Sequence, residues 1–68
     1  MSDLSKGDDV TWHSHGHTVH GTVVRKVTSE TDAGGRHVKA SKDDPQFVVE
    51  SDKTGKQAVH KPSALDPE

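Results

Sequence analysis

The pattern of apolar and polar residues along the chain is typical of short β-strands separated by polar turns. Large apolar residues recur at even spacings around Val10 and Trp12, within residues 18–28, and around Phe47. A repeat of two places alternate side chains on opposite faces of a strand. No stretch of the sequence repeats its apolar residues at the spacing of a helix. The chain is therefore predicted to form a small sheet.

The centre of that sheet is predicted to be a hairpin within residues 40–61. Residues 47–50 form one strand, with Phe47 and Val49 facing the core, and residues 57–60 return antiparallel to it. The turn between the two strands contains Gly55, which can adopt a positive φ without steric cost. A second turn, at residues 41–45, leads into the hairpin.

The residues before this hairpin predict further strands. Residues 10–12 begin the first strand, and the histidine-rich run 13–17 suits a loop or the mouth of a hairpin. Residues 18–28 form the longest strand, in which Gly21 marks a bulge or a bend. Arg25 interrupts the inward face of that strand, which predicts either a bulge after residue 24 or the end of the strand. Residues 29–36 are predicted to be a mobile loop and residues 37–40 a short strand.

Five short strands predict an all-β fold, a small five-stranded SH3-like or Tudor-type barrel. Pro62 starts a short C-terminal helical turn, and Leu65 is expected to fill the end of the barrel. Residues 7–66 are predicted to form this single domain. Residues 1–6 are a flexible N-terminal lead, and residues 67–68 are the C-terminal end.

The scarcity of large apolar residues limits how such a domain is stabilised. Of the 68 residues 26% are hydrophobic, and the aromatic residues are Trp12 and Phe47. We therefore expect a single core, in which truncation of Trp12 costs about 3–5 kcal/mol of stability. A core this small is compatible with a monomer or a small homo-oligomer.

Cysteine content, hydropathy and charge exclude several classes of protein. The chain has no cysteine, so neither disulfides nor thiolate metal ligands are available. It has no apolar run long enough for a signal peptide or a membrane span, which predicts a cytoplasmic protein without a membrane partner. A net charge of -2 disfavours nucleic acid as a partner, although a local basic patch stays open.

Three segments of the chain resemble one known family. They read GDDVTW, HGTVVRKV and KASKDDPQFVVESDKTGKQAVHKPSAL, and together they run from Gly7 to Leu65. The most specific part is ASKDDPQ, followed by an aromatic residue and then by VVESDKTGK. This pattern resembles the hypervirulence-associated Tudor domain family. The resemblance implies a five-stranded Tudor-type barrel and no established activity.

The first functional hypothesis is a non-catalytic module that binds a protein partner through its loops and an exposed strand edge. An aromatic cage for methylated lysine is not expected, because the core needs both Trp12 and Phe47. No nucleophile motif, carboxylate pair or phosphate loop indicates an enzyme, and no cofactor is predicted. The candidate binding surface consists of Lys42, Asp43, Asp44, Lys53, Lys56 and His60.

The six histidines support a second hypothesis, a metal-binding or pH-responsive protein. On a regular strand His13, His15 and His17 would share one face, and His20 or His37 could add a further ligand. Neutral imidazole suits zinc, nickel or copper. Gly16 interrupts the strand pattern within the run. The candidate metal ligands are His13, His15, His17 and His20.

A third alternative is a pore-forming oligomer that resembles the plasmid-encoded type II dihydrofolate reductase. That family also has an early Gly-Asp-x-Val and a late Val-Glu-Ser strand, which this chain has at residues 7–10 and 49–51. Where that family lines its pore with Val-Gln-Ile-Tyr, this chain has Gln-Ala-Val-His at residues 57–60. The central glutamine and the tyrosine are missing, which argues against reductase activity.

Overall fold

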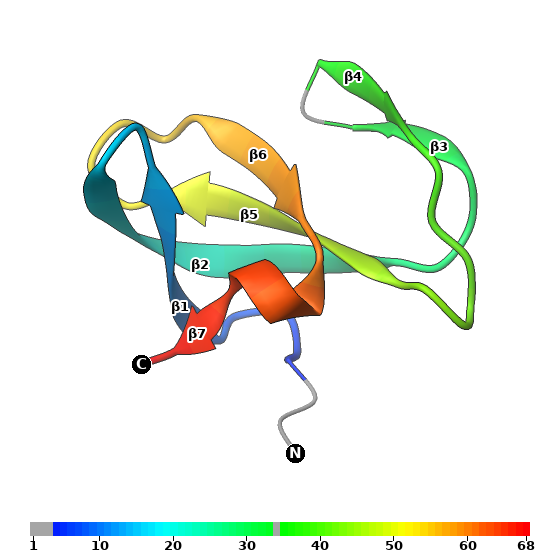
Figure 1. Ribbon diagram of the computed structural model, residues 1–68, viewed down its shortest axis with the longest axis horizontal. Coiled ribbons are helices and arrows are strands. Elements are labelled where there is room, and N and C mark those ends of the chain that lie inside the picture. Colours follow the sequence, from blue (N-terminus) through cyan, green and yellow to red (C-terminus); the bar gives the residue numbers. More distant parts are fainter. Residues whose placement is uncertain (1–3, 34) are drawn as a thin grey trace.

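The computed structural model describes residues 4–33 and 35–68, which fold into two antiparallel sheets (Figure 1). The larger sheet has five strands in the order β6-β5-β2-β1-β7. Its members are β1 (Asp9–Ser14), β2 (His17–Val27), β5 (Gln46–Ser51), β6 (Gln57–His60) and β7 (Asp66–Pro67). The smaller sheet is a hairpin of β3 (Thr31–Ala33) and β4 (Arg36–Val38). A single 3-10 turn, η1 (Pro62–Ala64), joins β6 to β7.

The predicted all-β class and the helical turn after Pro62 are confirmed. The five-stranded sheet is open rather than closed into a barrel, because β6 and β7 are its two edges. Within the described part of the chain no helix has the length and apolar character needed to cross a membrane.

The histidine-rich run forms a tight hairpin rather than a longer loop. Ser14 pairs with His17, so His15 and Gly16 alone make the turn between β1 and β2. His15 has a φ of 50° and Gly16 a φ of 80°. Two successive positive φ angles are typical of the type I′ turn, whose twist matches that of the strands it joins.

The long strand β2 contains a bulge beside Arg25, which is one of the two predicted alternatives. Val23 pairs with Val49 and Arg25 with Val48, so Val24 is the extra residue. Gly21 lies in regular pairing with Val10 and Ser51 instead of in a bulge.

The apolar residues form two clusters, which corrects the prediction of a single core. The first cluster contains Leu4, Val10, Trp12, Val23, Phe47, Val49 and Leu65. The second contains Val27, Val38, Ala40, Val48 and Val59. Strand β5 contributes to both clusters, because its alternate residues point to opposite faces and both faces are covered.

The predicted loop at residues 29–36 is largely the β3–β4 hairpin, which is a further correction. Thr31 pairs with Val38, Asp32 with His37, and Ala33 with Arg36. Residue 34, between β3 and β4 in the sequence, lies outside the described residues. The hairpin is held because Val38 is buried in the second cluster and Ala33 packs against that cluster. These two contacts could not be predicted from the composition of the segment, because most of its residues are polar.

Both ends of the described chain are tied to the sheet. Leu4, assigned from the sequence to the flexible lead, is buried in the first cluster, whereas residues 1–3 lie outside the described residues. At the other end β7 pairs with β1, and the Glu68 amide donates a hydrogen bond to the Asp9 carbonyl. Leu4 and Glu68 therefore both contact the rest of the fold.

Candidate edge-strand interface

The four candidate metal ligands are distributed around the β1–β2 hairpin rather than gathered. His13 is opposite Thr18 and His20 is opposite Thr11, which places both imidazoles on the outer face of the sheet. His17, opposite Ser14, is on the face that carries Trp12, and His15 is in the turn. His20 is in addition hydrogen-bonded to the carboxylate of Glu68. Among residues 4–33 and 35–68, no group of three or more His, Cys, Asp or Glu is arranged to hold a metal.

The candidate binding surface is divided between the two ends of β5. Lys42, Asp43 and Asp44 come just before β5, whereas Lys53 and Lys56 are in the turn that follows it (Figure 1). Five residue steps along a strand span about 17 Å, so these residues do not form one continuous surface. His60 lies in β6, opposite Phe47.

His60 connects the core to the edge of the sheet. Its half-buried ring lies with its centroid 5.6 Å from that of Trp12, at an interplanar angle of 43°. Burial lowers the pKa of His60 below its ordinary value, and the positive charge of Arg36 lowers it further. The imidazole is therefore neutral at physiological pH.

The edge strand β6 turns backbone groups outward. The Ser51 amide donates a hydrogen bond to the Lys56 carbonyl at 2.9 Å. Because residues of an antiparallel pair alternate, Ala58 and His60 also turn their amide and carbonyl groups toward β5. Gln57 and Val59 consequently present theirs to the open edge.

One side chain of the β3–β4 hairpin reaches this edge. Nη2 of Arg36 donates a hydrogen bond to the carbonyl oxygen of Val59 at 3.3 Å. Arg36 can do so because it shares the inward face of the hairpin with Ala33 and Val38. The guanidinium thus occupies one of the acceptors that an additional strand would use.

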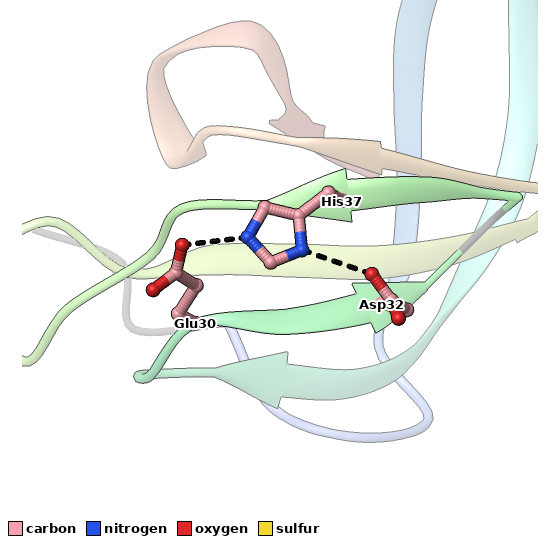
Figure 2. Close-up of polar contacts among 3 residues, drawn as sticks. All are labelled: Glu30, Asp32 and His37. Atoms are coloured by element: carbon pink, nitrogen blue, oxygen red, sulfur yellow. Dashed lines mark hydrogen bonds and ion pairs between the residues drawn. The ribbon is translucent and has the colours of Figure 1, made fainter.

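The outward face of the same hairpin carries a histidine held between two carboxylates (Figure 2). Nδ1 of His37 is 2.9 Å from Oδ1 of Asp32, and Nε2 is 2.6 Å from Oε2 of Glu30. These hydrogen bonds, first that to Glu30 and then that to Asp32, raise the pKa of His37 above its ordinary value. Both ring nitrogens donate only when the ring is protonated, so the arrangement favours the imidazolium.

This cluster is not among the residues predicted from the sequence, because the polar segment 29–36 is typical of a loop. A signal was present, since Glu30 and Asp32 are two residues apart and would share one face of a strand. A hairpin with two residues between its strands would then bring His37 opposite Asp32, which is the observed register.

The chain segment that contains β6 is basic. Residues 53–61 include Lys53, Lys56 and Lys61 and no aspartate or glutamate, and Arg36 adds a fourth positive charge at Val59. Lys61 lies 3.5 Å from a carboxylate oxygen of Asp44. No pocket is found on the surface of the described residues.

Comparisons with known proteins agree with the resemblance noted in the sequence. The family model described as the hypervirulence associated proteins TUDOR domain matches residues 7–65. Neither the curated proteins nor the solved structures include a significant match. The family match covers most of the chain and agrees with a small β-rich fold. The chain therefore belongs to the hypervirulence-associated protein Tudor domain family.

Proposed function

We propose that this Tudor-type chain is a non-catalytic interaction module that adds an extended segment of a protein partner to the edge of β6. The observation that carries the proposal is the outward direction of the backbone groups of Gln57 and Val59 at an open sheet edge. Such groups are a template for a further strand, whose main chain supplies the affinity.

Strand β6 is better suited to this role than the opposite edge. β7 has two residues, and one of them is Pro67, which has no amide hydrogen to donate. β6 has four residues, and its inner side is paired along its length with β5. An added strand would therefore rest on an edge that the core of the molecule already holds in place.

The proposal is tested by blocking the edge without disturbing the ladder to β5. Gln57→Pro removes an amide that points outward from an exposed position of an edge strand, where proline is tolerated. Gln57→Ala is the matched control, because it removes the same side chain and keeps the amide. A displayed library of short peptides, selected on the wild-type chain, provides ligands for all three proteins.

We expect the selected peptides to bind the wild-type chain and Gln57→Ala, and to bind Gln57→Pro at least about tenfold more weakly, since main-chain hydrogen bonds are lost. Amide hydrogen exchange should slow at Gln57 and Val59 in the complex. Peptides that bind Gln57→Pro equally well, or that protect amides elsewhere, would contradict the proposal.

A further inference from the structure

We infer that the segment received by β6 is acidic, and that one of its carboxylates takes the guanidinium of Arg36 away from the Val59 carbonyl. This inference rests on the proposed function, because it specifies the chemistry of the same partner. It follows from the charge around the edge and from the position of Arg36.

The charged residues of the segment 53–61, which contains β6, are all positive. Lys53, Lys56 and Lys61 flank the strand, and residues 53–61 include no carboxylate. The acidic residues that lie nearest to β6 are either paired with another side chain or located on the neighbouring strand. Asp52 accepts a hydrogen bond from Thr22 at 3.1 Å, Asp44 lies against Lys61, and Glu50 is one strand inward, opposite Gln57. An extended acidic segment would therefore be attracted to the lysines on either side of β6.

Arg36 provides one defined site at which a carboxylate of the partner could bind. Its contact with Val59, at 3.3 Å, is long for a hydrogen bond and uses one of the five N–H donors of the guanidinium. A strand added to β6 needs the Val59 carbonyl as an acceptor, so it competes with Arg36 for that oxygen. A carboxylate on that strand would then bind the fork of the guanidinium through two hydrogen bonds.

The observations favour a peptide over a nucleic acid. The outward groups of Gln57 and Val59 are complementary to another main chain, which a nucleic acid does not have. Proteins that bind single-stranded nucleic acid usually combine a basic groove with exposed aromatic rings. Here Trp12 and Phe47, the aromatic residues of the chain, are both buried.

Positive residues on an edge can also act only to prevent aggregation, because they discourage pairing with another strand. That function needs charge at the edge but no discrimination between acidic and neutral peptides. The experiment therefore measures discrimination, and it asks whether Arg36 is its source.

The probes are three soluble, strand-forming peptides that differ only in whether glutamate, glutamine or lysine alternates with threonine and valine. Affinity is measured by following the amides of β6 in NMR titrations, with the wild-type chain, Arg36→Gln and Arg36→Lys. Lys6→Gln is the matched control, since it removes the same charge from an exposed residue just before β1, and β2 and β5 lie between β1 and β6. Retention of the wild-type spectrum elsewhere checks that each variant is folded.

We expect the wild-type chain to bind the glutamate peptide about fivefold more tightly than the glutamine peptide and to bind the lysine peptide least. Arg36→Gln should lose the preference for glutamate over glutamine while binding the glutamine peptide at least as well, because Val59 is no longer occupied. Arg36→Lys should keep part of the preference, and Lys6→Gln all of it.

Equal binding of the glutamate and glutamine peptides at β6 would overturn the acidic partner and leave strand addition standing. A preference that survives in Arg36→Gln would overturn the assigned position of Arg36. If none of the three peptides bound at β6, both proposals would be overturned. Binding of a short single-stranded oligonucleotide at β6 instead of the peptides would also overturn both. Self-association of Arg36→Gln without peptide binding would identify the charges as protection of the edge only.

Discussion

Gly21 lies where two parts of the molecule approach too closely for a side chain. A Cβ atom built on it would overlap the carbonyl oxygen of Glu50 and lie 2.6 Å from Cζ3 of Trp12. A glycine in the middle of a strand is unusual, and from the sequence Gly21 was predicted to lie at a bulge or a bend. Its actual role depends on Trp12, which lies diagonally across from it on β1, and a sequence does not show how a ring is oriented.

We predict that Gly21→Ala destabilises the fold by about 1–3 kcal/mol, because the Trp12 ring and the neighbouring strand must both shift. Denaturant unfolding gives the free energy, and the emission maximum of Trp12, the one tryptophan of the chain, reports the displacement of its ring. Gly55→Ala is the control. Gly55 has a φ of 71° and open space around it, so this change should cost about 1 kcal/mol without moving the emission. An unchanged stability of Gly21→Ala would refute the close packing.

Among the elements, the β3–β4 hairpin differs most from what the sequence predicted. Its segment is polar and includes two glycines, so its composition is that of a loop. It forms a hairpin because Val38 and Ala33 reach the second cluster and Arg36 reaches Val59. Each of these contacts joins residues distant in the chain, which is why local composition did not reveal them.

The outward side of this hairpin should respond to pH through His37. Because the pKa of His37 is raised by Glu30 and then by Asp32, the charged ring stabilises the hairpin fully below its ordinary pKa of about 6.5. That contribution is lost as the pH rises through the higher pKa of the folded state. Glu30→Gln should lower the pKa of His37 more than Asp32→Asn does.

The measurement is an NMR titration of the His37 ring protons in the three proteins, together with amide exchange in β3 and β4. Glu50→Gln serves as the control, because Glu50 lies on β5 and is not a hydrogen-bond partner of His37. If His37 titrated at or below its ordinary pKa in the wild-type chain, the two contacts would not hold in solution.

At the scale of the whole molecule, the two apolar clusters meet through β5. Phe47 and Val49 belong to the first cluster and Val48 to the second. Sequence analysis expected alternate residues of this strand to be buried on one side only. It did not anticipate the second cluster, because the hairpin that covers that side had been interpreted as a loop.

We predict that the two clusters unfold together. Val48→Ala should destabilise the protein by about 2 kcal/mol, through lost burial and the cavity left behind. Trp12 lies in the other cluster, yet its fluorescence should report the same lower denaturation midpoint as the amides of the β3–β4 hairpin. Gln57→Ala, an exposed change, should stay within about 0.5 kcal/mol of the wild-type stability. A Trp12 transition that is unaffected by Val48→Ala would show that the clusters unfold independently.

The sequence by itself determined the all-β class, the family, the β5–β6 hairpin, the alternatives that included a bulge near Arg25, and the turn after Pro62. These features depend on residues close together in the chain or on a pattern along it. Only the tertiary structure decided that the sheet is open at β6, that the histidines are dispersed, and that Arg36 and His37 occupy opposite faces of one hairpin. Each of these depends on strand register and on long-range packing, which arise when distant segments bury apolar surface together.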